Sequence, residues 1–106
     1  MYKITDLIKV HDKTFVPYIS AEEIDTIISD IANRINADYA NKKPLIVAIL
    51  NGSFMVASDL VKKIDLPCEL SFVKFTSYQG TESSGEINEL IGFDRDIAGK
   101  DLIIVE

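Results

Sequence analysis

A run of six apolar residues at positions 45–50 constrains the fold of this chain more than any other feature. Such a run predicts a strand that is buried on both faces, as in a parallel sheet. The turn Asn51-Gly52-Ser53 follows at once, and residues 54–64 have the composition of a helix. This order would place free backbone N–H groups at the carboxyl edge of a sheet. The pattern therefore favours the binding of phosphate or another anion at the turn.

The flanking segments predict an α/β fold, with a parallel sheet flanked by helices. Ser20-Ala21-Glu22-Glu23 matches a capping box, so we expect a helix from there to about Tyr39. Its apolar stripe should contain five isoleucines: Ile24, Ile27, Ile28, Ile31 and Ile35. Further strands are expected over residues 69–76, 87–93 and 102–105, and an irregular or weakly β arm over residues 1–19. A parallel sheet needs helices on both faces, and the chain has only two good crossover helices, so we expect that the domain is incomplete or that another chain covers the exposed side of the last strand.

Composition limits the classes of function. With 106 residues the chain suits one domain, and its net charge of -6 argues against nucleic-acid and anionic-membrane partners. No apolar run approaches the ~18 residues of a membrane span, and charges interrupt the N-terminus where a signal peptide would be apolar. Cys68 is the single cysteine, which excludes an intrachain disulfide and fits a reducing compartment. We therefore expect a cytoplasmic protein.

Each candidate site has a plain structural interpretation beside the functional one. Glycine in the turn at residues 51–53 could serve only the backbone angles of a strand-to-helix connection. The turn lacks the lysine and spacing of a Walker loop and the three glycines of a dinucleotide fingerprint. The polar stretch 77–86 is either a solvated tip or a lid that closes Tyr78 over a ligand. His11, the only histidine, has no partners for a metal site or a catalytic triad, and Phe54 and Met55 are expected in the core.

Four stretches, taken in order along the chain, resemble the purine salvage phosphoribosyltransferases of the hypoxanthine (hypoxanthine-guanine) branch. They are similar to the start of the family's first helix, its pyrophosphate loop, its mobile catalytic loop and the strand that enters its phosphoribosyl-pyrophosphate motif. In this sequence they are residues 18–24, 48–60, 75–78 with 83–86, and 99–106. The resemblance implies that a purine base is joined to the ribosyl 5-phosphate of phosphoribosyl pyrophosphate, with Mg²⁺ as cofactor and pyrophosphate as product.

The resemblance also implies roles for particular residues. Leu50, Asn51 and Gly52 would form the pyrophosphate site, in which backbone N–H groups hold the anion and the Leu50–Asn51 peptide is cis. Asn51 stands where many family members carry lysine. The asparagine lacks the positive charge of that lysine, but the backbone N–H donors of the loop are kept. Ser77 and Tyr78 would be the catalytic residues on the mobile loop that closes over the reacting centre, where developing charge is stabilised and water excluded.

Glu106 would be the first of two adjacent acidic residues that bind the ribose hydroxyls and organise the metal, with no direct metal ligand in this chain. On the resemblance, residues 1–106 are the N-terminal part of a single phosphoribosyltransferase-like domain, cut short after the strand that ends at Glu106. The residues that select the purine would follow Glu106, so none is assigned here.

Two other functions stay open at this point. The chain could be a non-catalytic α/β fragment that dimerises or binds a ligand, since a partial sheet leaves apolar surface exposed. That exposure also leads us to expect a homo-oligomer. A regulatory relative that binds RNA is disfavoured by the net charge of -6, because contacts to nucleic-acid phosphates need basic residues.

Overall fold

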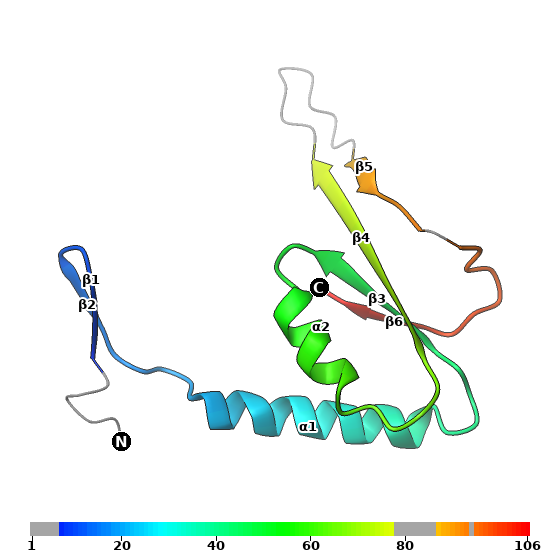
Figure 1. The fold of residues 1–106 in the computed structure, drawn as a ribbon, viewed down its shortest axis with the longest axis horizontal. Coiled ribbons are helices and arrows are strands. Elements are labelled where there is room, and N and C mark those ends of the chain that lie inside the picture. Colours follow the sequence, from blue (N-terminus) through cyan, green and yellow to red (C-terminus); the bar gives the residue numbers. More distant parts are fainter. Residues whose placement is uncertain (1–6, 78–86, 94) are drawn as a thin grey trace.

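The computed structural model describes residues 7–77, 87–93 and 95–106. It has an α/β fold with a four-stranded sheet, two helices and a separate small hairpin (Figure 1), which confirms the expected fold class. The elements in chain order are β1 (Ile8–Val10), β2 (Lys13–Phe15), α1 (Ala21–Asp38), β3 (Leu45–Leu50), α2 (Phe54–Val61), β4 (Glu69–Ser77), β5 (Ile87–Ile91) and β6 (Leu102–Val105).

The main sheet has the strand order β5-β4-β3-β6. β3 lies in the middle and pairs in parallel with both β4 and β6, so Ala48 is opposite Phe72 on one side and Val105 on the other. β5 pairs antiparallel with β4, which makes the sheet mixed. The expectation of parallel strands is thus confirmed for three of them. β5 differs because residues 78–86 are too few for a parallel crossover, which takes about a dozen residues.

Both helices lie against one face of the sheet. The core on this face joins α1, α2 and β6 through Ile28, Ala32, Ile35 and Leu60, against which Ile103 and Val105 pack. In the described part of the chain, neither helix packs against the other face. Part of that face is covered by the segment between β5 and β6, whose Ile97 packs against Leu45, Val47 and Val73. Ile104 of β6, the register partner of Val47, stays 59% exposed there.

Helix α1 begins as its sequence predicts. Ser20 accepts a hydrogen bond from the Glu23 N–H at 3.0 Å, and the Glu23 carboxylate accepts one from the Ser20 N–H, so both halves of the capping box are present. The predicted apolar stripe is only half correct. Ile28 and Ile35 are buried, whereas the other three isoleucines are exposed by 42–53%: Ile24, Ile27 and Ile31. The body of the described chain covers too narrow a strip of the helix to bury all five.

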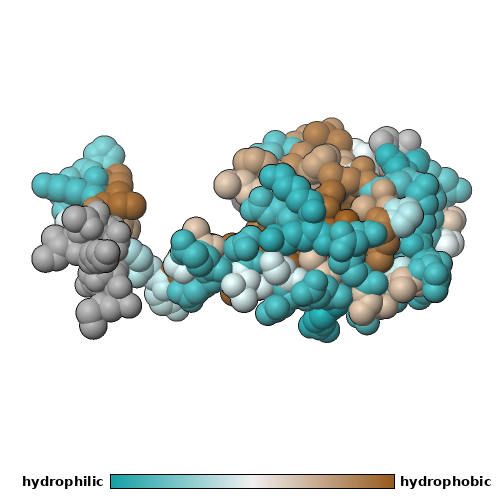
Figure 2. Space-filling view, turned by 60° about the horizontal axis from the view of Figure 1, so that its bottom comes forward, coloured by the Kyte–Doolittle hydropathy of each residue, from teal (hydrophilic) through white to brown (hydrophobic). Residues whose placement is uncertain are grey.

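The β1–β2 hairpin lies apart from the rest of the described chain (Figure 1). All of its side chains are exposed, including those of Ile8, Val10 and Phe15. The radius of gyration is 18.3 Å, against about 13 Å for a compact chain of this length. Figure 2 shows the hairpin as a separate lobe with apolar surface of its own. The expected weakly β arm is confirmed, and His11 lies in its turn with a positive φ of 58°, far from the sheet edge.

Helix α2 is shorter than expected, since it ends at Val61 rather than residue 64. Ala57 and Leu60 are buried, but Phe54 and Met55 are 56% and 64% exposed. The prediction that these two residues belong to the core is wrong. The first turn of α2 starts just past the end of β3, where the described chain offers little for it to pack against.

Candidate functional site

The loop of residues 51–53 turns the chain from the end of β3 into the start of α2. The peptide bond between Leu50 and Asn51 is cis, as the sequence resemblance implies. Ser53 is only 2% exposed, and its Oγ donates a hydrogen bond of 2.6 Å to the carbonyl oxygen of Ile49. The loop is therefore fastened to the strand that precedes it through the side chain of its last residue.

The first N–H groups of this loop have no acceptor among the described residues. The Phe54 N–H donates to the Asn51 carbonyl oxygen at 3.3 Å, and the Ala57 N–H donates to the Ser53 carbonyl oxygen at 2.8 Å. No such bond engages the N–H of Asn51 or Gly52, and both residues are exposed. Two unengaged donors thus lie at the carboxyl edge of the sheet, next to the start of a helix. That is an arrangement suited to an anion.

Gly52 is not required by the fold. Its φ lies outside the left-handed region that favours glycine, and a Cβ added to it would meet no atom within 4 Å. The interpretation in which glycine serves only the backbone angles of the connection is therefore wrong. Glycine also allows a ligand to approach the backbone closely. The open space beside Gly52 is compatible with that use.

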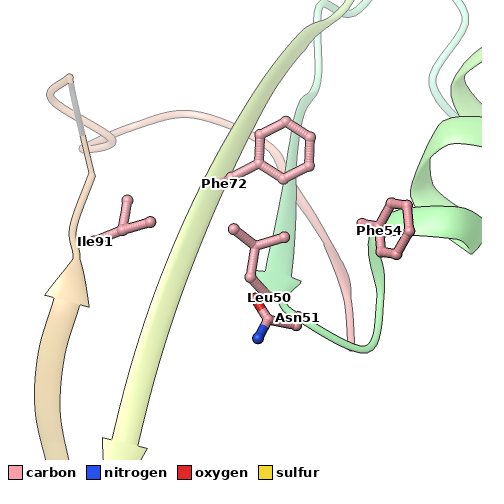
Figure 3. A pocket seen from close by; sticks show the side chains of 5 residues that line it. All are labelled: Leu50, Asn51, Phe54, Phe72 and Ile91. Atoms are coloured by element: carbon pink, nitrogen blue, oxygen red, sulfur yellow. The ribbon is translucent and has the colours of Figure 1, made fainter.

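An open cavity of about 610 Å³ adjoins this loop on the helical side of the sheet. Its lining comes from the end of β3, the start of α2, β4 and β5, through Leu50, Asn51, Phe54, Phe72 and Ile91. Figure 3 shows the Leu50 and Phe72 side chains between Ile91 on one side and Phe54 on the other, with Asn51 at the strand end. The cavity is almost wholly apolar, and Asn51 is its one polar lining residue within the described part of the chain.

Glu106 lies close to the same loop. Val105 is the register partner of Ala48, so Glu106 follows alongside Ile49 at the carboxyl end of β3. Its side chain is exposed. The chain leaves β3 toward β4 on one side, and β6 later returns on the other side of β3. Ligands of open α/β sheets bind at such a switch point, outside the carboxyl ends of the strands. The structure thus brings Leu50, Asn51, Gly52 and Glu106 to one edge.

Of the two residues expected on the catalytic loop, the structure describes only the backbone position of Ser77. Ser77 is the last residue of β4 and pairs with Ile87 of β5. Lys74 is the partner of Leu50, so Ser77 lies three residues, or roughly 10 Å, farther along the strand direction. Tyr78 and the rest of the stretch 78–86 lie outside the described residues. The idea of a lid over a ligand therefore stays a prediction.

The described chain contains neither a metal cluster nor a membrane-spanning helix. Across residues 7–77, 87–93 and 95–106, no group of three or more His, Cys, Asp or Glu side chains could hold a metal ion. Over the same residues, no helix has the length and apolar character needed to cross a membrane.

A cluster of charges lies at the opposite, amino-terminal end of the strands. Glu69 begins β4 and forms ion pairs with Arg95, with Lys43 at 3.3 Å and with Lys100 at 3.9 Å. The Arg95 guanidinium, followed by the Lys43 ammonium, holds the pKa of Glu69 below its usual range. This cluster fastens the segment between β5 and β6 to the start of β4. Sequence reasoning missed it because its members come from three separate segments: Lys43 before β3, Glu69 at the start of β4, and Arg95 and Lys100 between β5 and β6.

Comparison with known proteins identifies the family. The model of the phosphoribosyl transferase domain matches residues 20–106, which is most of the chain. The chain belongs to the phosphoribosyltransferase family. It is 40% identical to the hypoxanthine-guanine phosphoribosyltransferase of Streptococcus agalactiae over 88 residues. The aligned part is 82% of this chain and 49% of that protein. The Staphylococcus aureus protein of the same name is 36% identical over 89 residues, or 83% of this chain and 50% of that protein.

Solved structures agree with this assignment. The crystal structure of a hypoxanthine phosphoribosyltransferase from Staphylococcus aureus has a TM-score of 0.74 at 34% identity, and covers 94% of this chain and 51% of that one. A point mutant of the hypoxanthine phosphoribosyltransferase from Trypanosoma cruzi, complexed with the product IMP, has a TM-score of 0.72 at 29% identity, over 82% of this chain and 49% of that one. The chain spans about half the length of the relatives that it matches.

Proposed function

We propose that this chain is the pyrophosphate-binding part of a hypoxanthine-guanine phosphoribosyltransferase. The reaction would join a purine base to the ribosyl 5-phosphate of phosphoribosyl pyrophosphate and release pyrophosphate. The names of the relatives support the substrate class. The observation that carries the proposal is that the N–H groups of two exposed residues, Asn51 and Gly52, are unengaged within the described chain at the switch point of the sheet. These donors would stabilise the charge that develops on the leaving diphosphate.

The other residues at this edge have complementary roles in the proposal. Glu106 would bind the ribose hydroxyls through its carboxylate, beside the pyrophosphate loop. Ser77 and Tyr78 would act on the loop that closes over the reacting centre and excludes water. Leu50 would give shape to the loop as the residue before Asn51, while its side chain forms part of the apolar cavity.

Mg²⁺ is the cofactor in this proposal. Mg²⁺ is commonly bound by one or two carboxylates together with the phosphates of the substrate. Glu106, an exposed carboxylate beside the loop, would help to organise the metal through the ribose hydroxyls without ligating it directly, and phosphoribosyl pyrophosphate itself would supply ligands. The bound metal would neutralise charge on the diphosphate oxygens.

We infer two features of the biological setting. A free, half-buried Cys68 supports a reducing compartment such as the cytoplasm. The exposed apolar side chains at the start of α2 support a homo-oligomer. Light scattering on the purified chain tests the second inference, and a monomer over the accessible concentration range would contradict it.

Calorimetric titration of the chain with pyrophosphate and with phosphoribosyl pyrophosphate, both with Mg²⁺, tests the proposed function. We expect saturable binding of both ligands, and a loss of at least about tenfold in affinity for Gly52→Ala, because the added methyl would occupy the approach to the N–H donors. Ser58→Ala, on an exposed residue of α2, is the matched control and should bind as the wild type does. If the wild type binds neither ligand, the proposal fails and a non-catalytic α/β fragment is the better description.

A further inference from the structure

Lys74 lies in the sheet row that adjoins the pyrophosphate loop. It is the register partner of Leu50 on one side and of Ile91 on the other, and both of those residues line the apolar cavity. Phe72, two residues earlier in β4, lines the same cavity. Side chains two apart in a strand point to the same face, so Lys74 belongs to the face that carries the cavity.

Lys74 differs from two other half-buried basic residues in having no acidic partner among the described residues. Lys63 forms an ion pair of 3.0 Å with Asp25, and Arg95 pairs with Glu69. Lys74 is also half-buried, but neither an ion pair nor a hydrogen bond engages its ammonium within the described ranges. The stem of a half-buried lysine can pack on apolar neighbours while its ammonium stays in water. An ammonium with no partner in the described ranges is available to a ligand of opposite charge.

The other residues of the proposed pyrophosphate site carry no positive charge. Asn51, Gly52 and Ser53 are neutral, Glu106 is negative, and the chain as a whole has a net charge of -6. A diphosphate held by backbone N–H groups alone would approach against this field. Adjacent strands lie only ~5 Å apart, and Lys74 is directly beside Leu50, so an extended lysine side chain has the length to reach an anion at Asn51 and Gly52.

We propose that Lys74 is the residue that supplies the positive charge for diphosphate binding at the Asn51–Gly52 loop, an inference that rests on the proposed function. The backbone N–H groups fix the position of the anion, and the ammonium of Lys74 adds attraction from the neighbouring strand. Lys74 is thus a binding residue for the leaving group. It does this from a strand rather than from the loop, where many members of the family have their lysine.

The test is titration of the chain with inorganic pyrophosphate, and separately with phosphoribosyl pyrophosphate, at low and high ionic strength. Lys74→Gln removes the charge, Lys74→Arg keeps it, and Lys42→Gln is the matched control, since Lys42 is exposed near the amino-terminal end of β3. We expect Lys74→Gln to weaken binding about tenfold at low salt, as for one partly solvated charge pair. The loss should shrink at high salt because the lost attraction is screened. Lys74→Arg and Lys42→Gln should stay near the wild type.

The outcomes separate this inference from the proposed function. If the wild type binds neither ligand, both fail together. If the wild type binds and Lys74→Gln binds equally well, only the role of Lys74 is overturned. Equal losses in Lys74→Gln and Lys42→Gln would overturn it too, because they would report net charge rather than position. Lys74→Met, which keeps the apolar stem and so the packing, should reproduce the Gln result and decides the matter if Lys74→Gln unfolds.

Discussion

The Oγ of Ser53 donates a 2.6 Å hydrogen bond to the carbonyl oxygen of Ile49, across the loop that joins β3 to α2. This bond ties the last residue of the loop to the next-to-last residue of the strand. It also satisfies the Ile49 carbonyl group at the sheet edge. The N–H groups of Asn51 and Gly52, which lie between the two bonded residues, are left without an acceptor in the described chain. A side chain that closes the loop on itself therefore keeps the backbone donors available.

Ser53→Ala should lower both stability and ligand binding. The substitution leaves the Ile49 carbonyl without its donor in a site where Ser53 is 2% exposed, so we expect the free energy of unfolding to fall by about 1–2 kcal/mol. Urea denaturation measures that loss, and pyrophosphate titration should show weaker binding because the loop is no longer fixed. Ser58→Ala, at an exposed position of α2, should change neither quantity. Unchanged stability in Ser53→Ala would show that water replaces the bond at no cost.

Two glycines should respond to alanine in opposite ways. Gly99 has a positive φ of 74° in the turn before β6, whereas Gly52 has neither a left-handed φ nor a neighbour that a Cβ would strike. Gly99→Ala should therefore lower the free energy of unfolding by about 1 kcal/mol or more. Gly52→Ala should leave it unchanged or slightly raised, while it reduces affinity for pyrophosphate. Thermal unfolding of the two variants side by side gives the comparison. A marked loss of stability in Gly52→Ala would mean that the fold needs this glycine after all.

Much of the fold could be predicted from local sequence patterns. The capping box at Ser20, the apolar run of β3 and the terminal strand β6 each depend on neighbouring residues, and the structure has them where the sequence indicates. Patterns of this kind carry their own physical cause, such as hydrogen bonds at a helix start or burial on both faces. The cis peptide at Leu50–Asn51 was expected only through the family resemblance.

The sequence does not show which apolar side chains become buried against the rest of the fold. Ile24 and Ile31 have the spacing of a core stripe, and Phe54 is of a residue type common in cores, yet all three are exposed. Periodicity identifies a face of a helix but not the width of the surface that covers it. The site shows the same limit. Lys74 alternates with Phe72 on one face of β4, a pattern visible in the sequence, but its place beside Leu50 depends on strand register, which no local pattern fixes.

The capping box of α1 offers a further stability test. Ser20→Ala removes the side-chain acceptor of the Glu23 N–H, and should lower the free energy of unfolding by about 1 kcal/mol. The loss should appear in chemical denaturation followed by circular dichroism, since α1 is the longest helix of the described chain. Asn33→Ala, at an exposed position in the middle of the same helix, should be neutral or slightly stabilising. Equal behaviour of the two variants would show that the cap contributes nothing measurable.

The ion pairs of Glu69 predict a dependence of stability on pH. Arg95, Lys43 and Lys100 surround this carboxylate and lower its pKa from the ordinary 4.5. The carboxylate is therefore bound more favourably in the folded state, and its stabilising contribution is fully present above pH 4.5. As the pH falls through the lowered pKa of the folded state, the carboxylate takes up a proton and the contribution is lost.

Glu69→Gln should accordingly unfold at lower urea concentration than the wild type near neutral pH, and the difference should narrow below pH 4.5. The pairs are partly exposed, so added salt should also narrow the difference. Asp101→Asn, at an exposed position whose side chain forms no ion pair within the described residues, controls for the change in net charge. Urea midpoints measured across the acid range decide the matter. A difference between wild type and Glu69→Gln that stays constant down to the acid limit would show that Glu69 acts through packing and not through its charge.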